Sequence, residues 1–156
     1  MNVQKRVAGL VGAAATAVLL VVAGCAPTPP AATEIAVTGS LDTHDPALII
    51  DDLGTESLED DVWYIYSTGN GAIGLGSPQV RQSLDQGVTW TEVGPAWTAK
   101  DEPYWSRSIV EGVDNFWAPE VVEHEGTYYL YYSASTFGAN TSAIGLTTSA
   151  SLDPDD

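Results

Sequence analysis

The sequence is poor in basic residues, in cysteine and in histidine. Its 156 residues include 5 Lys and Arg against 21 Asp and Glu, which gives a formal net charge of −16. Nucleic acid is therefore excluded as a partner, because it is bound mainly through Lys and Arg. The single cysteine, Cys25, excludes an intrachain disulfide. The two histidines, His44 and His124, lie far apart without metal-ligand spacing, so no metal site is predicted.

Sustained helical periodicity is also absent from the body of the chain. Short runs rich in Val, Ile, Trp, Tyr and Thr alternate instead with clusters of Gly, Asn, Asp and Ser, which is typical of strands and turns. We expect strands in ALIID, VWYIYST, AIGLG, EVVEHEG, TYYLYYSAS and SAIGLTTS. The fold class is therefore all-β. The strand aromatics are expected in the core between sheets: Trp63, Tyr64, Tyr66, Tyr128, Tyr129 and Tyr131.

The N-terminus has the pattern of a targeting signal. Lys5 and Arg6 precede the apolar run VAGLVGAAATAVLLVVAG, and Cys25 follows it directly. The letters VAGC resemble the lipobox of bacterial lipoproteins, which implies cleavage before Cys25, lipidation of its sulfur and a protein anchored outside the cytoplasm at the bacterial membrane. An uncleaved membrane anchor is the alternative, because the run is nearly long enough to span a bilayer. Cleavage would remove Lys5 and Arg6 and take the net charge from −16 to −18.

Composition divides the chain into three parts. Residues 1–24 are the predicted signal peptide, and residues 25–34 include the stretch APTPPAATE, which has too few large apolar residues to pack and is expected to be an extended tether. Residues 35–156 form the body.

The body contains an internal repeat. HDPALII, DVWYIYSTGN, AIGLGS and QSLD are matched in order by WAPEVVE, TYYLYYSAS, SAIGLTTS and ASLD, at spacings of about 70 residues. Each unit holds several strands, which favours the blades of a β-propeller. Because the smallest propellers have about four blades, two cannot close a ring. We therefore expect this chain to be the N-terminal part of a longer protein.

One acid lies beside the proline at the start of each unit. Asp45 directly precedes Pro46, and Glu120 directly follows Pro119. The inner strands of propeller blades begin at one end of the central channel, so two acids at these positions would converge there. Paired carboxylates facing one cavity are what glycosidic bond cleavage needs. The alternative, that both acids merely cap strand starts, fits the pattern equally well.

The stretches HDPALI, WYIYSTG, NFWAPEVV and YYSASTFGANTSAIGL resemble glycoside hydrolase family 43, and most closely its endo-α-1,5-L-arabinanases, from about Thr43 to Pro154. The resemblance implies a five-bladed propeller that hydrolyses arabinan with inversion. It makes Asp45 the general base and assigns Glu120 to the position that tunes the pKa of the general acid. Glu120 departs from the usual Asp there. The general acid belongs to a later blade, so the chain alone is expected to be inactive.

Further roles follow from the same resemblance. It allows a calcium or other ion at the propeller axis of the full-length protein, held largely by residues of later blades, and it implies a monomer when full length. Other activities of the family, β-xylosidase or α-L-arabinofuranosidase, stay open, and so does a non-catalytic glycan-binding surface lipoprotein. Residues near the channel mouth are candidates for contact with the sugar: His44, Trp117, Phe137, Asn140 and Ser142.

The stretch SLDQGVTW, residues 83–90, matches the Asp-box S-x-D-x-G-x-x-W of sialidase-like propellers. The match implies a structural hairpin at the outer edge of a blade, away from any active site. It also keeps a sialidase as a rival interpretation. Sialidases bind their acidic sugar with several arginines, however, and the body offers only Arg81 and Arg107.

Overall fold

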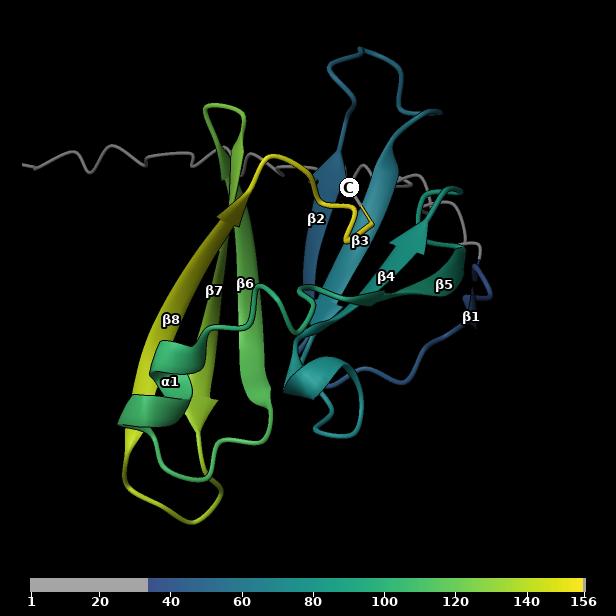
Figure 1. Ribbon diagram of the computed structural model, residues 1–156. Helices are drawn as coiled ribbons and strands as arrows, with labels where there is room; N and C mark the ends of the chain where they lie inside the picture. The colour runs from purple at the N-terminus through teal and green to yellow at the C-terminus, as the bar shows by residue number, and fades with distance from the viewer. Residues whose placement is uncertain (1–33, 156) are drawn as a thin grey trace, which may run out of the picture. The chain divides into compact units, whose positions relative to one another are not determined.

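Eight strands in two sheets make up almost all the regular structure of residues 34–155, the part of the chain that the computed structural model describes (Figure 1). The first sheet has the order β1-β5-β4-β3-β2, and its strands are β1 Thr38–Gly39, β2 Ala47–Asp51, β3 Val62–Ser67, β4 Gln79–Ser83 and β5 Thr89–Pro95. Strands β2 to β5 form an antiparallel meander, and β1 adds to the far edge by pairing in parallel with β5. The chain therefore crosses from one edge of this sheet to the other before it enters β2.

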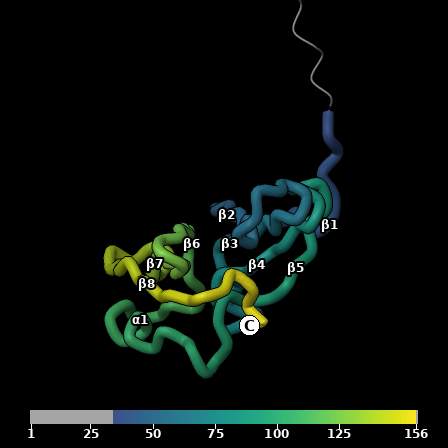
Figure 2. Tube along the Cα trace, turned by 90° about the horizontal axis from the view of Figure 1, so that it is seen from above, coloured from purple at the N-terminus to yellow at the C-terminus, as the bar shows by residue number. Residues whose placement is uncertain are grey.

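The second sheet is an antiparallel meander of β6 Phe116–His124, β7 Thr127–Ser135 and β8 Ser142–Ser149. Figure 2 shows β6 beside β2 and β3, while β5 and β8 lie farther out. The first strand of each meander is thus the one nearest the other sheet. This arrangement is the one expected of neighbouring propeller blades.

The core lies between the two sheets. Residues that alternate along the strands bring Tyr66 and Val80 of the first sheet against Val121 and Leu130 of the second. Aromatic rings fill the end of the core where β6 begins: the Tyr132 ring centroid lies 5.1 Å from that of Trp97 and 5.2 Å from that of Phe116.

Strand prediction was confirmed for β2, β3, β6, β7 and β8. It was wrong for AIGLG, which forms the short 3-10 helix η1 Gly74–Gly76 instead of a strand. Leu75 there has a φ of 56° and both glycines have positive φ, so the backbone cannot extend. The true counterpart of β8 in the first sheet is β4. The sequence repeat therefore pairs AIGLGS with SAIGLTTS, two segments of similar sequence that adopt different conformations.

One helix, α1 Tyr104–Ile109, lies between β5 and β6. The sequence analysis predicted none, because six residues are too few to display a helical period. Buried Ser106 caps the turn through a hydrogen bond from its hydroxyl to the Pro103 carbonyl (2.6 Å).

The Asp-box forms the predicted hairpin between β4 and β5, at the outer side of the first sheet. One oxygen of Asp85 accepts hydrogen bonds from the Thr89 amide (2.7 Å) and the Ser83 hydroxyl (2.7 Å). These bonds, the Thr89 amide first, hold the pKa of Asp85 below its usual value. Gln86 and Gly87 both have positive φ, which closes the turn.

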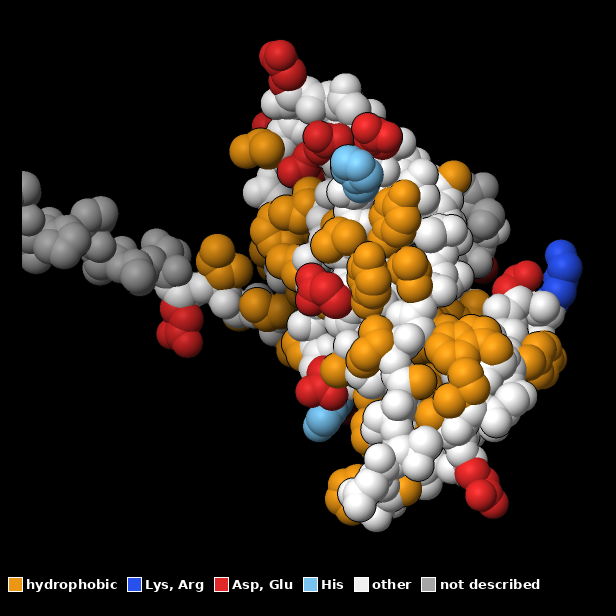
Figure 3. All heavy atoms as spheres, turned by 90° about the vertical axis from the view of Figure 1, so that its left-hand side faces the viewer, with side chains coloured by type: hydrophobic (Ala, Val, Ile, Leu, Met, Phe, Trp, Pro, Cys, Tyr) orange, Lys and Arg blue, Asp and Glu red, His pale blue; other side chains and the backbone are white. Residues whose placement is uncertain are grey.

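Each sheet also has an apolar face turned away from the core. Leu48 and Ile50 lie on that face of the first sheet, since their neighbours Ala47 and Ile49 face inward. Figure 3 views the side of the molecule on which β8 lies and shows hydrophobic side chains gathered across it. The exposed residues on the outward face of the second sheet include Val122, Tyr131, Ile144 and Leu146. Of the aromatics expected in the core, Tyr64 and Tyr66 are buried, whereas Tyr131 is 40% exposed.

No helix within residues 34–155 is long and apolar enough to cross a membrane. The predicted signal peptide, the lipidation site Cys25 and most of the predicted tether lie outside the described residues.

Candidate active site

Asp45 lies at the end of the first sheet where β2 begins and β3 ends. Asp45 precedes β2 by two residues, and Thr68 directly follows β3. The Thr68 amide donates to the His44 carbonyl (2.9 Å), which ties the two chain segments together just beyond the strand ends. Asp45 has a φ of 50°, a conformation that Asp tolerates better than most residues. Its side chain is 43% exposed.

Two hydrogen bonds hold the Asp45 carboxylate, and both go to the same oxygen. The Thr68 hydroxyl donates to Oδ2 (2.9 Å), and His44 Nδ1 lies 2.7 Å from Oδ2. An ionised carboxylate only accepts, so Nδ1 carries the proton of this bond. The Thr68 hydrogen bond, helped by that of His44, keeps the pKa of Asp45 below its usual value. Asp45 is therefore ionised at neutral pH.

Thr68 also joins Asp45 to the second sheet. Its hydroxyl oxygen accepts a hydrogen bond from the Ala118 amide (3.0 Å). A register shift between Trp117 and Glu120 forms a bulge there, and Ala118 takes a φ of 46°. The bulge turns one strand amide away from the ladder and toward the first sheet.

A short seam continues this junction between the sheets. The Gly69 amide donates to the Phe116 carbonyl (2.8 Å), and Asn115 Nδ2 donates to the Gly69 carbonyl (2.9 Å). A Cβ on Gly69 would collide with the backbone of Gly76, so only glycine fits there. The start of β6 is thus fixed against the segment that holds Asp45.

Buried Arg81 anchors the chain on both sides of Asp45. Its guanidinium donates to the Ser40 hydroxyl (3.2 Å) and the Asp42 carbonyl (2.6 Å) on the crossing segment, and to the Ser67 hydroxyl (3.0 Å) at the end of β3. Arg81, Asp42 and Ser67 border an open hollow of about 490 Å³ that His44 and Thr68 also line. Sequence reasoning missed this role because nothing in the letters QVRQS indicates that the arginine is buried.

Glu120 is placed differently from Asp45. It pairs with Tyr131 on β7, on the face of the second sheet that turns away from the core, and its side chain is exposed. Within residues 34–155 no hydrogen bond or ion pair joins the two acids. Their link runs through Thr68 and the Ala118 amide, two residues before Glu120.

The remaining candidates for sugar contact lie at the same end of the molecule as Asp45, where β6 and β8 begin and β7 ends. Trp117 is half-buried on β6, and Phe137 is 94% exposed in the β7–β8 loop, where Asn140 is also exposed. Ser142 instead shares a hydrogen bond with the Ser135 hydroxyl (2.8 Å), which closes this loop.

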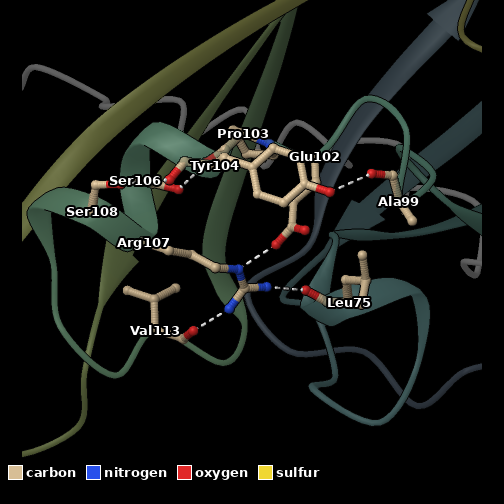
Figure 4. Close-up of polar contacts among 9 residues, drawn as sticks. All are labelled: Leu75, Ala99, Glu102, Pro103, Tyr104, Ser106, Arg107, Ser108 and Val113. Carbon is tan, nitrogen blue, oxygen red and sulfur yellow. Dashed lines mark hydrogen bonds and ion pairs between the residues drawn. The ribbon is translucent and has the colours of Figure 1, made fainter.

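Arg107 ties the helix α1 to η1 and to the segments on either side of the helix, as Figure 4 shows. Its guanidinium donates to the buried carboxylate of Glu102, to the Val113 carbonyl and to the Leu75 carbonyl (2.6 Å). It also lies 5.5 Å from the centroid of the Phe116 ring, which is a cation–π distance. Arg107 therefore supports the entry of the chain into β6.

The placement of the arginines weakens the sialidase interpretation. The guanidinium groups of Arg81 and Arg107 donate to groups within the protein, so they are not presented to an acidic sugar. Among residues 34–155 no group of three or more His, Cys, Asp or Glu side chains could hold a metal ion.

Comparison with known proteins shows the family of the chain. The sequence profile of glycosyl hydrolases family 43 matches residues 42–154. Over 115 residues the chain is 37% identical to the extracellular exo-α-(1→5)-L-arabinofuranosidase ArbA of Cellvibrio japonicus, covering 73% of this chain and 28% of that protein. It is 37% identical over 118 residues to the arabinan endo-1,5-α-L-arabinosidase A of Aspergillus niger, covering 76% and 32%.

Solved structures show the same relationship. The endo-arabinanase of Bacillus licheniformis superposes with a TM-score of 0.60 at 29% identity, covering 78% of this chain and 37% of that one. The α-L-arabinanase of Cellvibrio cellulosa, solved in complex with arabinohexaose, superposes with a TM-score of 0.55 at 37% identity, covering 74% and 32%. The chain thus spans about a third of the length of the relatives it matches. Because the profile covers most of its residues, the chain belongs to glycosyl hydrolases family 43.

Proposed function

We propose that Asp45 is the general base of a glycoside hydrolase that cleaves α-1,5-L-arabinofuranosidic bonds of arabinan with inversion. One observation carries the proposal. The Asp45 carboxylate is exposed and held through Oδ2 by Thr68 and His44, in a chain that belongs to family 43. A base must be deprotonated and oriented before it can activate water, and these two hydrogen bonds supply both conditions.

In the proposed step Asp45 takes a proton from a water molecule as the water oxygen bonds to the anomeric carbon. The glycosidic C–O bond breaks, its electron pair stays on the leaving oxygen, and a general acid protonates that oxygen. Asp45 ends the step protonated, the acid ends it ionised, and the configuration at the anomeric carbon is inverted. Two carboxyl groups of an inverting pair stand roughly 6.5–9.5 Å apart to leave room for the water. The acid itself is assigned to a later blade of the full-length protein.

Glu120 is proposed to tune the pKa of that acid. Its position two residues after Ala118 supports this role, because the Ala118 amide is bonded to the residue that holds Asp45. Its extra methylene relative to Asp carries the carboxylate farther from β6.

The two sheets are proposed to be neighbouring blades of a five-bladed propeller. The apolar outward face of each sheet supports this, since Leu48 and Ile50 on one side and Ile144 and Leu146 on the other are too exposed for a finished surface. Further blades would cover both faces.

An extracytoplasmic location is also proposed, in keeping with the extracellular relative from Cellvibrio japonicus. The lipid anchor on Cys25, the action on plant cell-wall arabinan and the monomeric state are part of the same proposal.

The test is reducing-sugar release from debranched arabinan by the protein expressed from its complete reading frame. Asp45→Asn keeps the size of the side chain but cannot accept the proton, so release should fall by roughly 10²- to 10⁴-fold. The matched control is Asp60→Asn in the exposed β2–β3 loop, where Asp60 bonds only Thr55; it should retain activity. Unchanged release by Asp45→Asn would refute the assignment.

No release by a well-folded parent protein that still binds arabinan would favour the second candidate function, a non-catalytic glycan-binding protein. The 94% exposed Phe137 ring, beside the loop residue Asn140, is the feature that favours binding. Affinity electrophoresis in arabinan gels separates the two cases, because it measures binding without turnover.

A further inference from the structure

Both hydrogen bonds to the Asp45 carboxylate converge on Oδ2, while no residue of 34–155 bonds Oδ1. The two oxygens are therefore inequivalent. The one without a protein partner is the one that can accept a proton from water without breaking an existing bond. This asymmetry depends on how firmly Oδ2 is held.

Thr68 fixes Oδ2 more firmly than His44 does. The His44 side chain is 81% exposed, so solvent competes for its hydrogen bond to Oδ2. Thr68 is half-buried and is itself fixed by the Ala118 amide from the second sheet. Because that amide donates to the hydroxyl oxygen, the hydroxyl proton is left to point at Asp45. Accepting the hydrogen bond from the Ala118 amide also strengthens the hydrogen bond that the Thr68 hydroxyl donates to Asp45.

We propose that Thr68, itself held by the Ala118 amide of the second sheet, is the positioning residue of the base, fixing Oδ2 of Asp45 so that Oδ1 alone faces the attacking water. The inference rests on the proposed function of Asp45. It adds that the orientation of the base, held within its own sheet by Thr68, also depends on the second sheet through the Ala118 amide. The bulge makes this arrangement possible, because in a regular β6 the Ala118 amide would bond within the strand ladder instead of to Thr68.

The test compares Thr68→Val with Thr68→Ser in the protein from the complete reading frame. Valine has the shape of threonine without the hydroxyl, so both hydrogen bonds vanish. Serine keeps both. Loss of the bond from Thr68 raises the pKa of Asp45, so the acid limb of the pH profile of kcat/KM should move to higher pH in Thr68→Val and return in Thr68→Ser. The plateau of kcat should fall by about 10- to 100-fold through misorientation, also restored by serine.

Asn115→Ala is the matched control. It removes another hydrogen bond of the same seam, that to the Gly69 carbonyl, without touching Asp45. If Thr68 merely staples the two sheets together, Asn115→Ala should shift the acid limb as Thr68→Val does. If Thr68 acts directly on Asp45, the acid limb of Asn115→Ala should stay at the pH where the parent protein has it. A shift in Asn115→Ala equal to that in Thr68→Val, or no shift in Thr68→Val, overturns the proposal.

A second measurement does not depend on turnover. The carboxyl ¹³C resonance of Asp45, identified by its loss in Asp45→Asn, reports the pKa directly. Thr68→Val should raise it and Thr68→Ser should not. If the parent protein releases no sugar, the proposed function fails, and this titration still decides whether Thr68 controls the carboxylate. An unchanged resonance titration in Thr68→Val refutes the Thr68 proposal whatever the activity.

Discussion

Replacing Gly145 by alanine should destabilise the protein through a single buried ring. Gly145 lies in β8 opposite Tyr132 of β7. An ideal Cβ on Gly145 would fall far inside van der Waals distance of Cζ and Cε2 of the Tyr132 ring. The ring cannot retreat, because Trp97 and Phe116 hold it with centroids 5.1 Å and 5.2 Å away. Only 2% of Tyr132 is exposed, and burial raises its pKa to about 12.

Two opposing effects set the size of the change. Alanine in a strand interior is worth about 0.5–1 kcal/mol more than glycine, because it loses less backbone entropy. Overpacking a rigid core costs about 1–3 kcal/mol. The ring cluster around Tyr132 puts Gly145→Ala near the upper end of that cost, so we expect a net loss of about 2 kcal/mol in the free energy of unfolding.

Urea unfolding followed by tryptophan fluorescence measures this loss as a lower midpoint at an unchanged slope. The control is a double-mutant cycle with Tyr132→Leu, whose smaller side chain leaves room for the methyl group. In the leucine background Gly145→Ala should cost clearly less than in the parent protein, which gives a coupling energy between the two sites. Equal costs in both backgrounds, or a Gly145→Ala protein at least as stable as the parent, would refute the steric reasoning.

Two other substitutions test the supports of the site and of the hairpin. Arg81→Met should lower the free energy of unfolding by about 2–4 kcal/mol, because it leaves the Asp42 carbonyl without its charged donor; Arg81→Lys should recover only part of this, since one ammonium cannot replace a planar fork. A midpoint of thermal unfolding unchanged in Arg81→Met would contradict that expectation. For Asp85, the lowered pKa means that its contribution to stability is present above the unfolded pKa of about 3.9 and is lost as the pH falls. The difference in melting temperature between the parent and Asp85→Asn should therefore shrink between pH 7 and pH 3, and calorimetry showing a constant difference would be evidence against it.

The strands that the sequence predicted correctly are those with aromatic and β-branched residues in long runs. The strand β4 was not predicted because it carries Gln79, Arg81 and Gln82. Polar residues of this kind are typical of a solvated loop. Arg81 and Gln79 are nonetheless buried, since the crossing segment and η1 cover them. Burial of this kind depends on tertiary contacts that no local pattern encodes.

The error at AIGLG has a similar origin. Its letters match those of β8, and its apolar residues favour a strand. Its conformation is decided elsewhere, because Gly76 lies against the backbone of Asp114 and Asn115, where a Cβ would collide. The contact comes from the segment just before β6, nearly 40 residues away in sequence, so similar local sequences adopt different structures.

Asp45 could be predicted as a candidate because the repeat and the family resemblance both led to it. Thr68 could not, since a threonine at a strand end usually belongs to a turn. A signal was nevertheless present. Once β2 and β3 are paired as an antiparallel hairpin with Ala47 opposite Tyr66, the residue that follows β3 lies at the same end of the hairpin as Asp45, just before β2. The role of Ala118 carried no such signal, because a bulge before a proline leaves only an ordinary alanine in the sequence.

Strain at Asp45 and Ala118 is the physical link between fold and site. Both residues have positive φ, which costs a residue other than glycine about 1–2 kcal/mol. Both residues are hydrogen-bonded to Thr68, but the bond from the Ala118 amide forms only while the two sheets are docked. If the first sheet separated from the second, Thr68 would lose this amide donor, and its hydroxyl would no longer be fixed toward Oδ2 of Asp45. The orientation of the Thr68 hydroxyl therefore depends on the packing at the start of β6, where Phe116 contacts Tyr132, so a methyl group added at Gly145, on a different strand, should disturb the site as well as the core.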